Sequence, residues 1–98
     1  MVEIVRSEEF AAWFRKLRDR RAQARIAVRL DRMADGNLGD VRPVDGGVSE
    51  LRIHYGPGYR VYFVQKGDVL IILLCGGDKD TQEADIRRAH TLAIEYEE

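Results

Sequence analysis

Three side chains that can carry positive charge flank a predicted tight turn in the segment SELRIHYGPGYRVYF, residues 49–63. Arg52 and His54 precede Gly56-Pro57-Gly58, and Arg60 follows it. Apolar and polar residues alternate on both sides of this turn, which predicts a β-hairpin with both arginines on one face. Like charges that lie close together across two strands repel each other. The arginine pair is therefore expected to meet a carboxylate of the same chain, open water or an external anion.

Both kinds of neutralising group have support in the sequence. The candidate internal partners are three carboxylates, Glu50, Asp78 and Asp80. For an external anion, Lys79 would add a third cation if the apolar strand before it lies beside the strand of Arg60. Guanidinium groups bind phosphate oxygens in pairs, so such a cluster would suit a phosphate. The glycines Gly76 and Gly77 are expected to let another chain approach the backbone there.

Aromatic side chains of the same segment could stack on a nucleotide base. The candidates are Tyr55, Tyr59 and Tyr62, and ordinary packing within the strands is the alternative use of each ring. Two histidines, His54 and His90, and one cysteine do not have the spacing of metal ligands. Neither a metal ion nor any other cofactor is expected.

The composition favours a single folded domain over residues 1–98. Hydrophobic residues make up 45% of the 98 residues, and the formal net charge is only −1. Charge is nevertheless uneven: residues 15–32 are rich in arginine, whereas residues 83–98 are mostly acidic. The basic segment could steer an anionic partner or simply form a solvated helix surface.

Cysteine and hydropathy patterns suggest the compartment. Cys75 is the single cysteine and lies in an apolar run, so a buried, unreactive thiol is expected and an internal disulfide is excluded. The longest apolar run, Val69 to Cys75, is too short to span a bilayer, and its flanks do not match a signal peptide. A soluble, cytoplasmic protein without a membrane partner is expected.

Three helices are predicted from apolar spacing and capping residues. Ser7 is the expected N-cap of a first helix whose aromatic stripe begins at Phe10. A break at residues 19–21 separates it from a second helix, which Gly36 ends. Asp80 is the expected N-cap of a helix near the C-terminus, with Glu83 completing a capping box.

Strands account for most of the remaining sequence. Residues 2–6 form a short predicted strand, and residues 48–55, 59–65 and 69–75 form three more. The last of these is apolar throughout, as expected for a strand covered on both faces. The loop of residues 36–47 is long enough for part of it to pair as a strand. The predicted class is α+β, in the order β-α-α-β-β-β-α.

Four blocks of the chain resemble the RelE/ParE superfamily of toxins, and the HigB-like, phage-derived addiction module killer branch in particular. The blocks are FAAWFRKLRD, ARIAVRLDRMADGNLGD, VSELRIHYGPGYRVYF and LLCGGDKDTQEADI. Together they cover essentially the whole chain. The resemblance implies a RelE-like fold, in which a twisted, mainly antiparallel sheet is packed by an N-terminal helical hairpin and a C-terminal helix.

The resemblance also implies a function. Many relatives are toxins of type II toxin–antitoxin systems that cleave mRNA on the ribosome, so ribosome and mRNA are the expected partners. A small helix-turn-helix antitoxin is expected as well, in an oligomeric complex that binds DNA through the antitoxin. Two alternatives are a toxin that inhibits DNA gyrase, as in the ParE branch, and an inactive homologue that serves as a regulatory partner of the antitoxin.

Residue roles follow from matching the basic positions of RNA-cleaving relatives. The expected reaction needs no metal: the 2′-hydroxyl attacks the neighbouring phosphate and leaves a cyclic phosphate. Arg60 would stabilise charge at phosphorus, Arg52 and Lys79 would hold phosphates, and His54 would act as general base or acid. On this basis Arg60→Ala is expected to relieve growth arrest without unfolding the protein.

Overall fold

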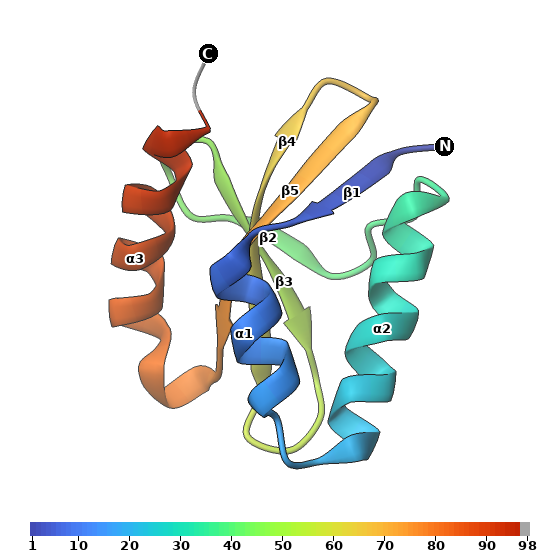
Figure 1. Cartoon of the computed structure of the whole chain (residues 1–98), viewed down its shortest axis with the longest axis vertical. Helices are drawn as coiled ribbons and strands as arrows, with labels where there is room; N and C mark the ends of the chain where they lie inside the picture. The colour runs from blue at the N-terminus through green and yellow to red at the C-terminus, as the bar shows by residue number, and fades with distance from the viewer. Residues whose placement is uncertain (97–98) are drawn as a thin grey trace.

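A five-stranded sheet with the order β1-β5-β4-β3-β2 forms the centre of the computed structural model, which describes residues 1–96 (Figure 1). The strands are β1 (Glu3–Arg6), β2 (Val41–Pro43), β3 (Val48–Ile53), β4 (Tyr59–Lys66) and β5 (Leu70–Gly77). Only the β1–β5 pair is parallel. The predicted α+β class and mainly antiparallel sheet are confirmed, and β2 is the strand that the long loop was expected to contain.

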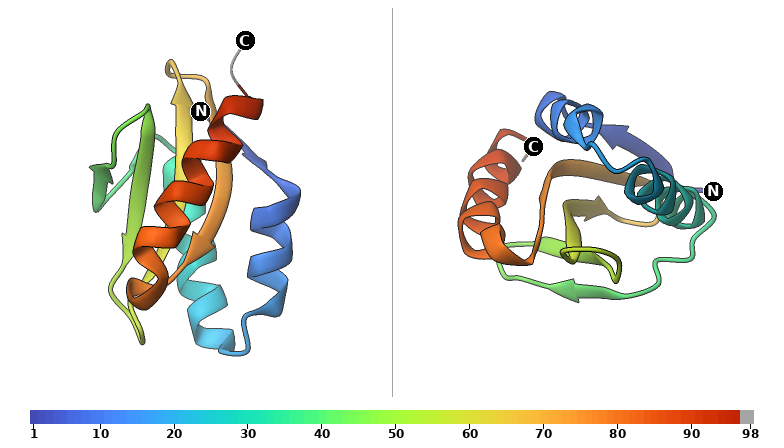
Figure 2. Two further views of the ribbon diagram at one scale, coloured as in Figure 1. Left: turned by 90° about the vertical axis from the view of Figure 1, so that its left-hand side faces the viewer. Right: turned by 90° about the horizontal axis from the view of Figure 1, so that it is seen from below.

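Helices cover both faces of this sheet. They are α1 (Glu8–Lys16), α2 (Arg20–Ala34) and α3 (Gln82–Glu95), with a 3-10 turn, η1 (Lys79–Thr81), before α3. Helices α1 and α2 run in opposite directions on one side, and α3 lies on the other (Figure 2). Among residues 1–96, no helix is both long and apolar enough to cross a membrane.

Capping side chains fix where the helices begin. The Ser7 hydroxyl accepts the backbone N–H of Phe10 at 3.0 Å and donates to the carbonyl of Leu74 at 2.7 Å, which ties α1 to β5. The prediction of Asp80 as the final N-cap is wrong. Asp78 caps the chain instead, forming a capping box with Thr81, because the helical path begins as the 3-10 turn η1.

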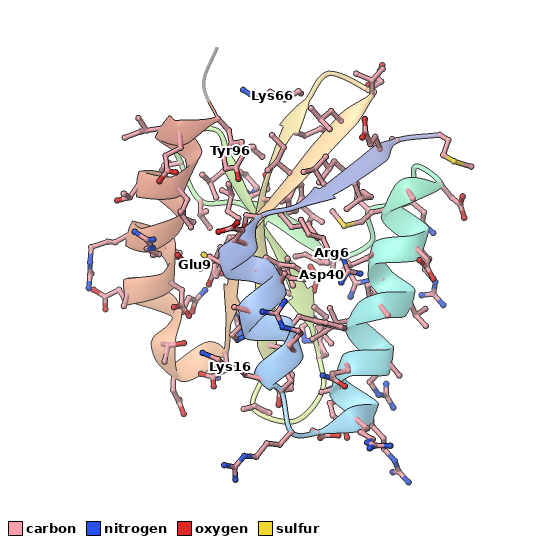
Figure 3. All side chains as sticks on the ribbon, in the orientation of Figure 1. Arg6, Glu9, Lys16, Asp40, Lys66 and Tyr96 are labelled. Atoms are coloured by element: carbon pink, nitrogen blue, oxygen red, sulfur yellow. The ribbon has the colours of Figure 1, made fainter. Side chains whose placement is uncertain are left out.

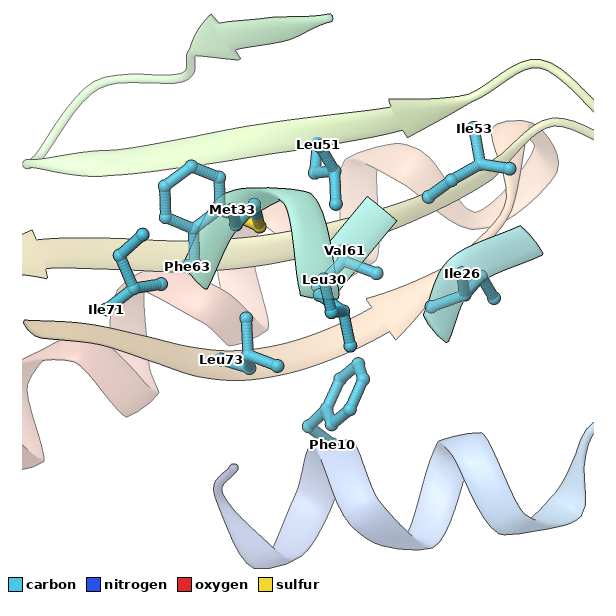
Figure 4. Packing of buried hydrophobic residues seen from close by; sticks show 10 residues of the cluster. All are labelled: Phe10, Ile26, Leu30, Met33, Leu51, Ile53, Val61, Phe63, Ile71 and Leu73. Carbon is cyan, nitrogen blue, oxygen red and sulfur yellow. The ribbon is translucent and has the colours of Figure 1, made fainter. Parts of the chain in front are cut away.

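The hydrophobic core has two parts, one on each side of the sheet. Side chains from α1 and α2 meet the inner residues of β3, β4 and β5 in the larger part (Figure 4). Its members are Phe10, Ile26, Leu30, Met33, Leu51, Ile53, Val61, Phe63, Ile71 and Leu73. Helix α3 covers the second part, which contains Tyr62, Leu74 and Cys75. Strand β5 contributes to both parts, so it is covered on both faces, as predicted.

Candidate active site

The β3–β4 hairpin places the two predicted arginines directly opposite each other. Arg52 pairs with Arg60 in the antiparallel register, which confirms that they share one face of the sheet. The turn between the strands needs two left-handed residues, Gly56 at φ +58° and Gly58 at φ +81°. A pocket of about 330 Å³ lies at this end of the sheet. Its charged or aromatic lining residues are Arg52, His54, Tyr55, Arg60 and Lys79.

Lys79 reaches this pocket because β5 ends beside β4. Arg60 pairs with Gly77, and the backbone N–H of Lys79 lies 3.4 Å from the carbonyl oxygen of Pro57 in the turn. A Cβ atom on Gly58 would lie 3.2 Å from Nη1 of Arg60 and 3.5 Å from Cβ of Lys79. Gly58 therefore lies next to both Arg60 and Lys79, and a side chain at this position would crowd the Arg60 guanidinium.

A buried carboxylate holds Arg60 in place. Oε2 of Glu50 lies 3.4 Å from Nε of Arg60, and the Glu50 side chain is completely buried. The same oxygen accepts hydrogen bonds from Nε2 of Gln82 at 2.7 Å and from the Tyr62 hydroxyl at 3.2 Å. Burial, and then the nearby Glu50 charge, raise the pKa of Tyr62. Nη1 of Arg60 also donates to the carbonyl of Gly58 at 2.7 Å. Of the three predicted internal partners, Glu50 is the one that pairs with an arginine of this site.

A second carboxylate, Asp40, lies between Arg52 and His54. Its Oδ2 atom is 3.6 Å from Nε of Arg52 and 2.5 Å from Nε2 of His54. The hydrogen bond from His54 is the largest cause that lowers the pKa of Asp40. Arg29 braces this region from α2, because its Nη1 donates to the carbonyl of Arg52 at 2.7 Å. Asp40, labelled in Figure 3, was not among the site residues predicted from the sequence.

Three tyrosines were expected to stack on bases, and the structure separates them. Tyr55 lines the pocket, although its hydroxyl already donates to Asp19 at 3.0 Å. Tyr59, like Tyr55, packs against the part of the core that α1 and α2 cover, and its ring meets the edge of Trp13 at a centroid distance of 6.2 Å. Tyr62 is fully buried under α3. A ring without exposed surface cannot stack on a base, so the expectation for Tyr62 is wrong.

The paired glycines at the end of β5, Gly76 and Gly77, serve the chain's own packing. A Cβ on Gly76 would overlap with the ring of Trp13, and one on Gly77 would overlap with the Asp85 carboxylate. The expectation that these glycines admit another chain is therefore corrected: side chains of the same chain occupy that space. These glycines contribute to the site only indirectly. They let the end of β5, just before Lys79, lie close to α1 and α3.

Charges in the pocket are only partly compensated. Arg52 faces Asp40 and Arg60 faces Glu50, whereas Lys79 is exposed and forms no salt bridge among residues 1–96. Three cations and two carboxylates leave one net positive charge when His54 is neutral. This balance suits a single phosphodiester, and Lys79 is the group that is free to receive it.

The sequence of this chain matches a known protein family. The family described as "Phage derived protein Gp49-like (DUF891)" matches residues 12–95. The chain belongs to the Gp49-like family. An uncharacterized protein of Haemophilus influenzae is 48% identical over 94 residues, which are 96% of this chain and 95% of that protein. The Gp49-like match runs from within α1 to the last residue of α3, so it includes every residue of the candidate site.

Proposed function

We propose that this Gp49-like protein is the toxin of a type II toxin–antitoxin pair, in the HigB-like branch of the RelE/ParE superfamily, and that it cleaves mRNA on the ribosome. A small helix-turn-helix antitoxin would neutralise it. The observation that carries the proposal is the convergence of Arg52, His54, Arg60 and Lys79 on one pocket, although Lys79 lies far from the others in sequence. Family membership and the α+β fold support the same assignment.

The proposed chemistry uses only groups of the chain and the RNA. The 2′-oxygen forms a bond to the adjacent phosphorus while the bond from phosphorus to the 5′-oxygen breaks, which leaves a 2′,3′-cyclic phosphate. His54, whose Nε2 faces Asp40, takes the proton of the 2′-hydroxyl on its other nitrogen, and the departing 5′-oxygen gains a proton from water. Lys79 and Arg60 stabilise the charge that develops on the phosphate oxygens.

A second function, inhibition of DNA gyrase, is favoured by one observation. Both arginines of the hairpin already face carboxylates of the same chain, Asp40 and Glu50. Ion pairs of this kind also occur for purely structural reasons, so the two arginines need not contact RNA. A toxin that only binds a protein target would not need a free cation such as Lys79 in this pocket.

The experiment that separates these functions is induction of the chain in cells without its antitoxin, followed by mapping of mRNA 5′ ends. Cleavage predicts new ends within translated reading frames, whereas gyrase inhibition predicts intact messages and gyrase-linked DNA breaks. Lys79→Ala is the informative variant, because the Lys79 side chain is exposed and forms no salt bridge among residues 1–96. It should abolish the new ends and leave the folded fraction unchanged.

Lys66→Ala is the matched control for this experiment. Lys66 is also exposed, but it lies at the β4–β5 turn, at the other end of the sheet (Figure 3). It should retain the RNA ends of the wild type. Equal cleavage by Lys79→Ala and wild type would remove the pocket from the mechanism, and equal loss in both lysine variants would point to general electrostatic attraction.

A further inference from the structure

One carboxylate oxygen is shared by two residues of the candidate site. Oδ2 of Asp40 lies 2.5 Å from Nε2 of His54 and 3.6 Å from Nε of Arg52. The first distance is a short hydrogen bond, whereas the second is too long for one, so Arg52 is attracted by charge alone. Nε of Arg52 is buried and has no hydrogen-bond partner among residues 1–96. Asp40 therefore holds the imidazole closely and the guanidinium only loosely.

The backbone around Asp40 is fixed by contacts with β3 and α2. The carbonyl oxygen of Asp40 accepts the backbone N–H of Arg52 at 3.0 Å. From α2, Nη2 of Arg29 donates to the carbonyls of Leu38 at 3.4 Å and of Asp40 at 3.5 Å. Gly39, at φ +73°, leaves room for this guanidinium, because a Cβ atom there would lie 2.8 Å from Nη2 of Arg29. The loop before β2 therefore presents the Asp40 carboxylate to the imidazole in a defined position.

His54 lines the phosphate pocket and also a groove beside α2, and cations of four elements line these two hollows with it. They are Arg21, Arg25, Arg29 and Arg32 on α2, Arg52 on β3, Arg60 on β4 and Lys79 on η1. Tyr55 is the other titratable side chain of the lining, and its hydroxyl is bound to Asp19. Among residues 1–96, Asp40 is the one carboxylate in contact with His54. The cations oppose a positive charge on the imidazole, and Asp40 supplies the counter-charge.

We propose that Asp40 is a positioning residue shared by Arg52 and His54, and that a phosphate bound to Arg52 leaves this carboxylate to His54 alone. In the free chain, Asp40 holds the imidazole with its proton on Nε2, which leaves the lone pair on Nδ1. When phosphate oxygens replace Asp40 as the partner of Arg52, the whole carboxylate charge acts on His54. Binding of the substrate then strengthens the base that takes its proton.

A phosphate is a better partner for Arg52 than Asp40 is. A guanidinium binds phosphate oxygens in pairs at hydrogen-bond distance, whereas Asp40 lies 3.6 Å from Nε. The Arg52 side chain is 24% exposed and lines the pocket, so a ligand can reach it. Without the Arg52 contact, the Asp40 charge stabilises the proton that Nδ1 of His54 takes from the 2′-hydroxyl more strongly. The inference rests on the proposed function, because it concerns the same pocket and the same proton.

The first test follows the proton on Nε2 of His54 by NMR of the ¹⁵N-labelled full chain. A proton shared with a carboxylate resonates far downfield and exchanges slowly with water, whereas the ring proton of an exposed, unpaired histidine is lost to exchange. The wild type should show this signal, and Asp40→Asn should lose it. Inorganic phosphate should move the signal further downfield, and sodium chloride at equal ionic strength should not. Arg52→Gln should show the shifted signal without phosphate.

Two matched controls lie at the other end of the sheet. His90 is the second histidine, and its Nε2 faces the carbonyl oxygens of Val44 and Asp45 at 3.1 Å and 3.0 Å. The His90 signal should respond neither to Asp40→Asn nor to phosphate. Asp45→Asn removes an exposed carboxylate at φ +74°, a conformation that asparagine tolerates. This variant should leave the His54 signal unchanged.

The second test is single-turnover cleavage of mRNA on ribosomes, with the concentration of the ribosome–mRNA complex varied. Asp40→Asn should lower the maximal rate roughly 10- to 100-fold, because part of the contribution of the general base is lost. The half-saturating concentration should change by about twofold or less, since Lys79 and Arg60 still bind the phosphate. Asp40→Glu, which keeps the charge, should recover part of the rate, and Asp45→Asn should cleave like the wild type.

Three results would overturn the inference alone. A His54 signal that survives Asp40→Asn would mean that another group holds the proton. A signal that phosphate does not move, or that Arg52→Gln leaves at the wild-type position, would show that Arg52 does not compete for the carboxylate. Equal cleavage by Asp40→Asn and wild type would make the pair an ordinary surface contact, while the proposed function would stand. A wild-type chain that cleaves no mRNA would instead overturn the proposed function, and this inference with it.

Discussion

Nε of Arg60 lies 3.4 Å from Oε2 of Glu50, and the carboxylate of Glu50 has no exposed surface. A buried pair of this kind gains its stability from mutual compensation, because each charge alone would be costly to remove from water. Gln82 and Tyr62 both donate to Oε2 and connect the carboxylate to the start of α3 and to β4, whereas Oε1 is buried without a hydrogen-bond partner among the described residues. The predicted catalytic arginine is therefore also a structural one.

Arg60→Ala should lower the free energy of unfolding by about 3 kcal/mol, since the Glu50 carboxylate would stay buried without its partner. This result would correct the expectation that the variant leaves folding intact. The double variant Glu50→Gln/Arg60→Met, which removes both charges, should recover most of the loss. Urea unfolding at neutral pH measures both effects. An Arg60→Ala protein as stable as the wild type would show that Glu50 is compensated in another way.

Asp40→Asn should make the free energy of unfolding less dependent on pH in the acidic range. The hydrogen bond from His54 lowers the pKa of Asp40 in the folded state, whereas the unfolded value is about 3.9. The carboxylate of Asp40 therefore binds a proton less readily in the folded chain than in the unfolded chain. Its contribution to the free energy of unfolding is fully present above the pKa of the unfolded state, and it is lost as the pH falls through the pKa of the folded state. Urea unfolding of both proteins between neutral and acidic pH tests this. Parallel curves for wild type and variant would contradict it.

Gly76→Ala should destabilise the fold by about 1–3 kcal/mol, because the added methyl group overlaps with the Trp13 ring and forces it to move. The smaller side chain of Trp13→Leu should relieve that overlap. The double variant should consequently be more stable than the sum of the two single effects predicts, a coupling that a double-mutant cycle of thermal or urea unfolding measures. Additive effects would mean that the two residues do not share this space.

Cys75 should be protected from alkylation in the folded protein. Burial raises the pKa of its thiol to about 12, and Sγ lies 3.7 Å from the carbonyl oxygen of Asp85. Since the thiolate is the reactive species, iodoacetamide at pH 8 should label the chain only after denaturation. Mass spectrometry of timed samples, with and without urea, follows the modification. Labelling of the native chain at the rate of a free cysteine would contradict the burial of this side chain.

Local sequence signals were sufficient for most of the fold. Ser7 and Gly36 mark the ends of helices where the structure places them, and the alternation around Gly56-Pro57-Gly58 gives the hairpin its correct faces. These features depend on neighbours within a few residues. The N-cap was misassigned to Asp80 because Asp78 and Asp80 are equally good capping residues, and only the three-dimensional path selects between them.

The candidate site was harder to predict because its carboxylates come from different elements. Arg52, Arg60 and Lys79 stand out as cations, and the pairing of β4 with β5 follows from their short connection. Asp40 gives no such signal: it lies in a glycine-rich loop, and its contact with His54 depends on how β2 pairs with β3. The burial of Tyr62 depends on where α3 packs, which the alternation of β4 alone does not reveal.

The parallel pairing of β1 with β5 joins two strands that lie far apart along the chain. Glu3 is aligned with Leu70, so the first strand of the sheet pairs with a segment that lies far along the chain, beyond β2, β3 and β4. Contacts so distant along the chain slow folding. The sheet is therefore complete only when β5 has paired on both of its edges, and the placement of Lys79 beside the hairpin depends on that pairing.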